Sequence, residues 1–274
     1  MDRLFPQLMA VFAITQLIGL CVGVSLIGAI ETGELEQPTV VTENPDDPIN
    51  AIALIVYILF FTGMLLILMR LFKGRWLFKL LETVVVFTAS IIVFSAFIPS
   101  IAFLFTVLIV GLRLLMPGHI MLRNCVAIIA ISGVGAMVGV TLGVIPIVLF
   151  LILLACYDFI AVFKTKHMVT LAKGIANRNL AFTVAMPTPK HQFELGTGDL
   201  VLPLAFAVSV MESKQAIGFP GFVFPAVLVL AASLAGLLIT IWYANRHVGK
   251  ALPALPLQAA FMVMAWALSV AVLP

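Results

Sequence analysis

Residues 144–163 read VIPIVLFLILLACYDFIAVF, an apolar run that contains a single charged residue, Asp158. A bilayer core about 30 Å thick needs about 20 apolar helical residues to cross it. This run has that length, and its acid lies near its C-terminal end. The stretch therefore predicts a transmembrane helix that carries a carboxyl group within the membrane.

The composition extends this reading to the whole chain. Of 274 residues, 63% are hydrophobic and only 10% are charged, with a mean hydropathy of +1.23, which excludes an ordinary soluble domain. The net charge of +3 comes from basic residues scattered between apolar runs, so we expect no nucleic-acid partner. Three cysteines within or beside apolar runs predict no disulfide framework. The expected solvent is a lipid bilayer.

Breaks at charged residues, Pro and Gly divide the chain into nine candidate spans, which predict an all-α, polytopic transmembrane bundle. We expect one integrated membrane domain, with spans one to five in an N-terminal part (1–143) and spans six to nine in a C-terminal part (144–274). The candidate spans are 6–30, 51–69, 81–98, 101–116, 124–142, 144–163, 195–211, 219–243 and 252–273.

The basic residues predict the orientation, because short cytoplasmic loops collect Lys and Arg. With the N-terminus inside, 14 of the 15 basic residues face the cytoplasm and only Lys214 lies outside. The first outer loop carries six acids and no base, and nine spans put the C-terminus outside. The longest inner connection, 164–194, is either a solvated surface loop or a substrate-facing segment.

Two acids, Asp158 and Asp199, stand within apolar sequence, whereas Glu82 lies at the inner edge of the third span. Asp158 precedes Lys164 by six residues, about 9 Å along a helix, and Asp199 follows Glu194 by five, about 7.5 Å. Antiparallel neighbouring spans would hold both acids at one depth near the inner face. Two such carboxyls cannot both ionise easily, so together they can activate water and protonate a scissile carbonyl.

Residues around the acids suit this role, although each has a plainer explanation. Gly196 and Gly198 permit close backbone approach before Asp199, or serve helix packing. Tyr157 can hydrogen-bond near the acids, or be an interfacial aromatic. Pro253 opens the ninth span at the same face and loosens its helix start, which is also common at helix entrances.

Taken together, these motifs resemble the presenilin and signal peptide peptidase family of intramembrane aspartyl proteases. They are Tyr157-Asp158, Gly196-Thr197-Gly198-Asp199 and Pro253-Ala254-Leu255, in this order on spans six, seven and nine. The resemblance implies that Asp158 and Asp199 are catalytic, so that spans six to nine (144–274) form the catalytic part. It also implies that Pro253-Ala254-Leu255 shapes the active site or substrate seat. Thr197 replaces a frequent Leu, which bears on substrate preference. The predicted orientation is similar to that of presenilin. The short inner connection resembles that of a compact microbial relative.

The resemblance implies transmembrane helices or signal peptides as substrates and the plasma membrane of a microbe as the location. No cofactor and no obligatory accessory subunit are implied, and a homo-oligomer is compatible with the sequence. The main alternative is an ion- or proton-coupled secondary transporter with paired intramembrane acids. The spacing of the four histidines matches no zinc protease motif, and no Gly-x-Ser-x-Gly supports a serine nucleophile.

Overall fold

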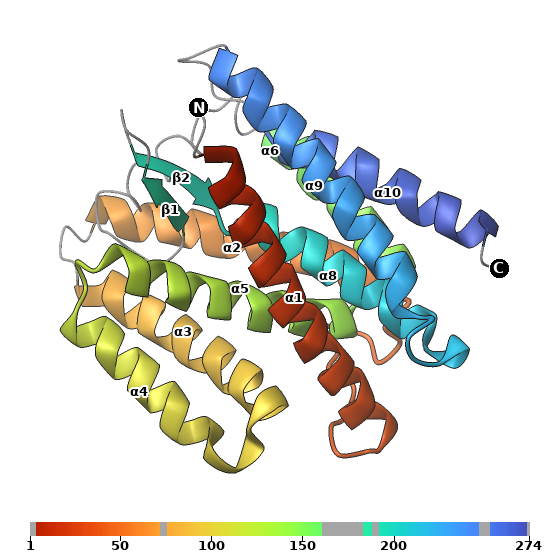
Figure 1. Cartoon of the computed structure of the whole chain (residues 1–274), viewed down its shortest axis with the longest axis horizontal. Coiled ribbons are helices and arrows are strands. Elements are labelled where there is room, and N and C mark those ends of the chain that lie inside the picture. The colour runs from red at the N-terminus through yellow and green to blue at the C-terminus, as the bar shows by residue number, and fades with distance from the viewer. Residues whose placement is uncertain (1–3, 72–75, 161–182, 188–191, 247–252, 273–274) are drawn as a thin grey trace.

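The computed structural model describes residues 4–71, 76–160, 183–187, 192–246 and 253–272, whose helices form one bundle (Figure 1). The described residues contain nine α-helices, one for each predicted span, so the helical fold class is confirmed. They are α1 (Leu4–Glu31), α2 (Pro48–Leu71), α3 (Trp76–Phe97), α4 (Ala102–Leu115), α5 (Ile120–Thr141), α6 (Val144–Ile160), α8 (Gly198–Ser213), α9 (Val223–Arg246) and α10 (Leu255–Val272).

Length and composition support a membrane location for most of these helices. Five of the described helices, α1, α2, α3, α5 and α9, are long and apolar enough to cross a bilayer. Shorter apolar helices cover Pro99–Leu115, Val144–Ile160 and Leu255–Ala271. The outer surface of the bundle is apolar as well: Phe60, Trp76 and Leu115 are 65%, 76% and 81% exposed. Side chains of this kind suit contact with lipid rather than water.

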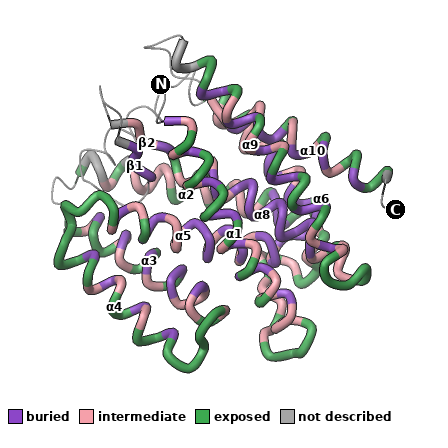
Figure 2. The backbone as a smooth tube through the Cα atoms, in the orientation of Figure 1, coloured by how far each residue is buried: buried purple, intermediate pink, exposed green. Residues whose placement is uncertain are grey.

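Helix α8 occupies the centre of the bundle, where buried positions concentrate (Figure 2). Eleven of its 16 residues are buried, and it packs against α1, α5, α6 and α9. A Cβ at Gly23 of α1 would lie 2.7 Å from Val208, and one at Gly139 of α5 would lie 2.6 Å from it. Only glycine permits these two helices to approach α8 so closely.

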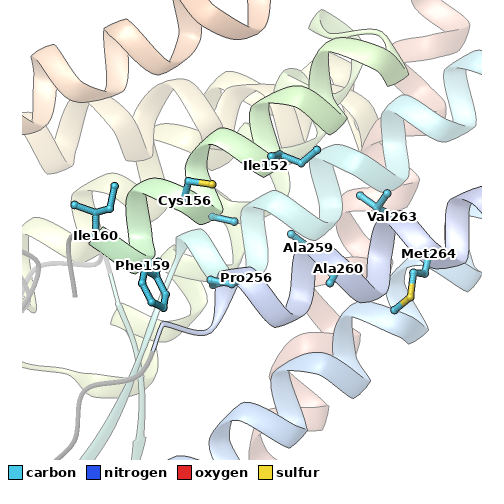
Figure 3. Close-up of a pocket in the computed structure, with 10 residues that line it drawn as sticks. Ile152, Cys156, Phe159, Ile160, Pro256, Ala259, Ala260, Val263 and Met264 are labelled. Atoms are coloured by element: carbon cyan, nitrogen blue, oxygen red, sulfur yellow. The ribbon is translucent and has the colours of Figure 1, made fainter. Parts of the chain in front are cut away.

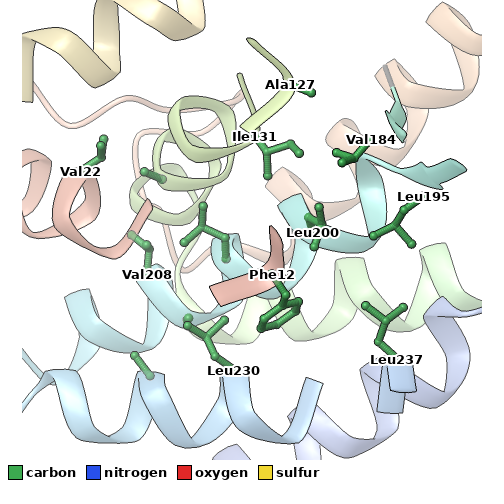
Figure 4. Packing of buried hydrophobic residues seen from close by; sticks show 14 of the residues in the cluster. Phe12, Val22, Ala127, Ile131, Val184, Leu195, Leu200, Val208, Leu230 and Leu237 are labelled. Atoms are coloured by element: carbon green, nitrogen blue, oxygen red, sulfur yellow. The ribbon is translucent and has the colours of Figure 1, made fainter. Parts of the chain in front are cut away.

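The hydrophobic core joins the two ends of the chain. Figure 4 shows Leu200 and Val208 of α8 among side chains of α1, α5 and α9. A second cluster lies between α2, α6, α8 and α10, around Phe150 and Phe206. The proposed division of this bundle at residue 143 stays a prediction.

A β-hairpin departs from the all-α prediction. Strand β1 (Thr183–Pro187) pairs antiparallel with β2 (Gln192–Gly196), in a register that sets Ala185 opposite Glu194. The seventh span was therefore predicted to begin too early, at 195, because β2 precedes α8. Residues 161–182 and 188–191, with most of the inner connection, lie outside the described residues. So do nine of the basic residues used for the orientation: Arg3, Lys73, Arg75, Lys164, Lys166, Lys173, Arg178, Lys190 and Lys250.

Candidate active site

Helices α6 and α8 bring the two intramembrane acids together. Asp158 lies two residues before the end of α6, and Asp199 is the second residue of α8. The two helices pack against each other, and both acids are partly buried. The carboxyls are close enough to interact electrostatically. The fold therefore places the acids beside each other, while their catalytic role stays a prediction.

The start of α10 contacts this pair. Pro253 and Ala254 are not helical, and the helix begins at Leu255. The backbone N–H of Leu255 donates a hydrogen bond to the Asp158 carboxylate, while its side chain is buried in the second core cluster. Ala254 packs against the first cluster. The segment Pro253-Ala254-Leu255 thus borders the acids through its backbone.

The glycines before Asp199 adopt two different conformations. Gly196 ends β2, whereas Gly198 begins α8, and Thr197 between them is the N-cap residue of that helix. A Cβ at Gly196 would lie 3.6 Å from the Asp199 Oδ2 atom, an ordinary contact. A Cβ at Gly198 would meet nothing within 4 Å. Neither glycine therefore packs against a neighbouring helix, and Gly196 borders the Asp199 carboxyl.

Tyr157 lies next to Asp158 in both sequence and space. The phenol is partly buried and interacts electrostatically with the Asp158 carboxyl. It therefore belongs to the surroundings of the acid pair.

Other buried polar residues have separate partners. Glu82 of α3 pairs with Arg113 of α4 at 2.9 Å, with both side chains 7% exposed. At the other end of the bundle, the Gln37 amide donates to Glu212 at 2.9 Å. His119 accepts a hydrogen bond from the Leu122 N–H and caps α5. Within the described ranges, no cluster of three or more His, Cys, Asp or Glu could hold a metal ion.

Residues 9–195 match the protein-family model described as signal-peptide peptidase, presenilin aspartyl protease. The chain belongs to this family. The match spans more than half of the chain and ends four residues before Asp199, so it is independent of that acid. The protein is accordingly an intramembrane aspartyl protease, a hydrolase, and the expectation from the sequence motifs is confirmed.

Two solved structures of a presenilin family intramembrane aspartate protease, in different crystal forms, share the fold. One is 20% identical with a TM-score of 0.66, over 96% of this chain and 95% of its own. The other is 23% identical with a TM-score of 0.66, over 94% of this chain and 96% of its own. No curated protein matches the chain.

In this family member, the hairpin before Asp199 is anchored to α5. The Asn124 side chain donates to the Ala185 carbonyl at 2.7 Å and accepts from the Ala185 N–H at 2.9 Å, as a neighbouring strand would. The buried Arg123 donates to Glu194 at 3.3 Å, and Thr183 donates to the other oxygen of that carboxylate. These contacts fix the strand that leads into Gly196.

An apolar groove opens between α6 and α10 (Figure 3). Its volume is about 690 Å³, and its lining includes Pro256 of α10 and Cys156 and Phe159 of α6, which stand near Asp158 in the sequence. Cys156 is a free, exposed thiol, as are the other two cysteines. The groove gives apolar segments a surface along the two helices that carry Asp158 and Leu255.

The sequence reasoning missed the polar residues that hold this site. Asn124, Gln16 and Gln258 each make hydrogen bonds that support it. The available signal was a neutral polar residue within an apolar span, since such residues need partners in a membrane.

Proposed function

We propose that this protein hydrolyses peptide bonds within transmembrane segments or signal peptides, with Asp158 and Asp199 as its catalytic pair. The convergence of these two carboxyls beside Leu255 carries the proposal. Loss of either carboxyl would leave the other without its partner. The remaining residues of the three motifs, Tyr157, Gly196–Gly198 and Pro253–Leu255, shape the site.

The chemistry follows from the shared environment of the two acids. Adjacent carboxyls resist double ionisation, so the pair holds one proton between them. One carboxylate removes a proton from water, and the other acid protonates the oxygen of the scissile carbonyl. The pair then titrates as one unit, and neither step requires a cofactor.

The substrate segment must be unwound, because the hydrogen bonds of a regular helix shield its peptide bonds. We infer that the unwound segment pairs with the hairpin in a membrane version of strand addition. Asn124 already occupies the backbone groups of Ala185 on β1, whereas β2 leads directly to Asp199. A substrate strand along β2 would bring its peptide bonds to the acids, and the α6–α10 groove would receive its apolar end.

The orientation is part of this proposal. We infer nine spans, with the N-terminus and the acids toward the cytoplasm and the C-terminus outside, in the plasma membrane of a microbe. The distribution of basic residues supports this orientation. No obligatory accessory subunit is invoked, and a homo-oligomer is compatible with the proposal.

Cleavage of a single-span substrate by purified protein tests the catalytic pair. Asp158→Ala and Asp199→Ala should each abolish product while the protein remains folded, since the two acids act as a unit. Near-wild-type cleavage by either variant would contradict the proposal. A transporter would instead move ions or protons across vesicles without releasing a cut product.

Matched substrates test strand addition. A substrate with Gly or Pro near the inner end of its span should be cut faster than a Leu-rich one of equal length, because its helix unwinds more easily. Binding must be equalised by comparing rates at saturation. Equal cleavage rates for the two substrates would contradict strand addition.

Cysteine labelling of intact cells tests the orientation. In a background with Cys21, Cys125 and Cys156 replaced, a membrane-impermeant thiol reagent should label a cysteine at position 40 but not one at position 178. The opposite pattern would reverse the topology.

A further inference from the structure

Pro203 lies within α8, one turn after Asp199. In an α-helix the carbonyl of each residue accepts from the N–H four residues later, and proline has none. Pro203 lies inside the helix, so the Asp199 carbonyl lacks its usual donor. An unsatisfied carbonyl is costly inside a membrane protein, and a side chain from another helix can satisfy it.

Gln258 of α10 supplies this donor. Its amide Nε2 donates to the Asp199 carbonyl at 3.1 Å and also lies 3.1 Å from the Ser233 hydroxyl of α9. The side chain of Gln258 is completely buried, and its Oε1 has no partner among the described residues. A carbonyl can only accept, so the amide nitrogen must face Asp199.

The backbone of Gln258 packs closely against α9. A Cβ at Gly236 of α9 would lie 3.0 Å from the Gln258 Cα, so the two helices are in close contact there. Leu255, whose N–H binds Asp158, lies three residues before Gln258 and therefore on the same face of α10. The first turn of α10 thus holds one acid by its carboxylate and the other by its backbone.

We propose that Gln258 is a positioning residue, which replaces the donor lost at Pro203 and fixes Asp199 relative to Asp158. This inference rests on the proposed function, because it assumes that both acids are catalytic. Gln258 itself touches no reacting atom. Its effect should therefore appear in kcat, with KM nearly unchanged.

Gln16 of α1 offers a matched control. Its amide donates to the neighbouring carbonyl of Leu200 at 3.0 Å, and this side chain is also buried. The residue four positions after Leu200 is Leu204, which keeps its backbone N–H. Losing the Gln16 amide therefore leaves the Leu200 carbonyl with a donor, whereas losing Gln258 leaves the Asp199 carbonyl with none.

A double-mutant cycle with Pro203→Ala tests the proposal, because this substitution restores the missing N–H to the Asp199 carbonyl. In the otherwise wild-type protein, Gln258→Met should lower kcat about tenfold per folded enzyme. In the Pro203→Ala background, the same substitution should cost less than about twofold. Gln16→Met should have a similar, smaller effect in both backgrounds. If Gln258→Met does not fold, Gln258→Asn, with a shorter amide, replaces it in the cycle.

Equal losses in the two backgrounds would overturn the proposal, and so would an unchanged kcat in Gln258→Met. An inactive Pro203→Ala variant would also overturn it, because a backbone donor to the Asp199 carbonyl would then be incompatible with the active position of the acid. A change confined to KM would indicate a role in binding instead and would overturn it as well. Active Asp199→Ala would refute the proposed catalytic pair itself, which is a separate outcome.

Discussion

At the scale of the residue, Leu255 serves the site through its backbone and the core through its side chain. Its N–H donates to the Asp158 carboxylate, and its side chain is 4% exposed. Leu255 is also the first residue of α10, a position where proline is tolerated. The hydrogen bond can therefore be removed without breaking the helix.

We expect Leu255→Pro to lower the cleavage rate about tenfold or more, because a hydrogen bond to a charged group is lost. Leu255→Ala is the control, since it keeps the N–H and removes only core packing. The cleavage rate per folded enzyme distinguishes loss of the N–H from loss of core packing. A Leu255→Pro variant as active as wild type would show that the N–H has no role in catalysis.

Gly198 allows a second prediction, in which a substitution lowers activity without lowering stability. Its missing side chain faces open space beside Asp199, and the residue is helical. Gly198→Ala should leave thermal stability unchanged or slightly raised, since Ala favours the helix. Cleavage should fall severalfold, because the methyl group occupies space that a substrate backbone needs. Unchanged cleavage would mean that the substrate does not approach there.

The acids could be predicted from the sequence and the groups that hold them could not. Carboxylates in apolar spans are rare, so Asp158 and Asp199 stand out in the sequence. The depth of each acid follows from the number of residues between it and the nearest charged residue of a loop. Gln258 is a neutral residue in an apolar helix, and the sequence does not tell which neighbour it faces. Its partner carbonyl depends on how α8 and α10 pack.

At the scale of the element, apolar length predicted the helices, and no comparable signal predicted the hairpin. Val184, Met186 and Leu195 are buried, but the strands have only five residues each. Strands this short are stabilised by contacts from elsewhere, here from Asn124 and Arg123 of α5. Such long-range pairing is not visible in a local pattern.

The buried ion pair between α3 and α4 gives a prediction about stability. Glu82→Met leaves the buried Arg113 without its carboxylate and should lower the free energy of unfolding by about 3 kcal/mol. Glu82→Met with Arg113→Met removes both charges and should recover most of that loss. Denaturant titration in detergent measures the free energy of unfolding of the single and the double variant. A double variant no more stable than the single one would contradict this account.

At the scale of the whole molecule, the bundle surrounds α8 with helices and holds Asp199 at one end of it. This arrangement keeps the acids within the membrane-embedded protein, while the hairpin leads directly to Asp199 and the groove runs between α6 and α10. The helix count and the family were accessible from the sequence, whereas the order of packing around α8 was not. The packing role of Gly23 and Gly139 depends on their contact with Val208, which the sequence does not show.

The most direct test of the central claim is the mass of the cleavage products in proteoliposomes. With a single-span substrate, wild-type protein should cut inside the span, toward its inner end, since Asp158 lies two residues before the end of α6. Asp158→Asn and Asp199→Asn, which preserve side-chain shape, should yield no product. Product ends outside the span, or cleavage that persists in either Asn variant, would contradict intramembrane catalysis by this pair of aspartates.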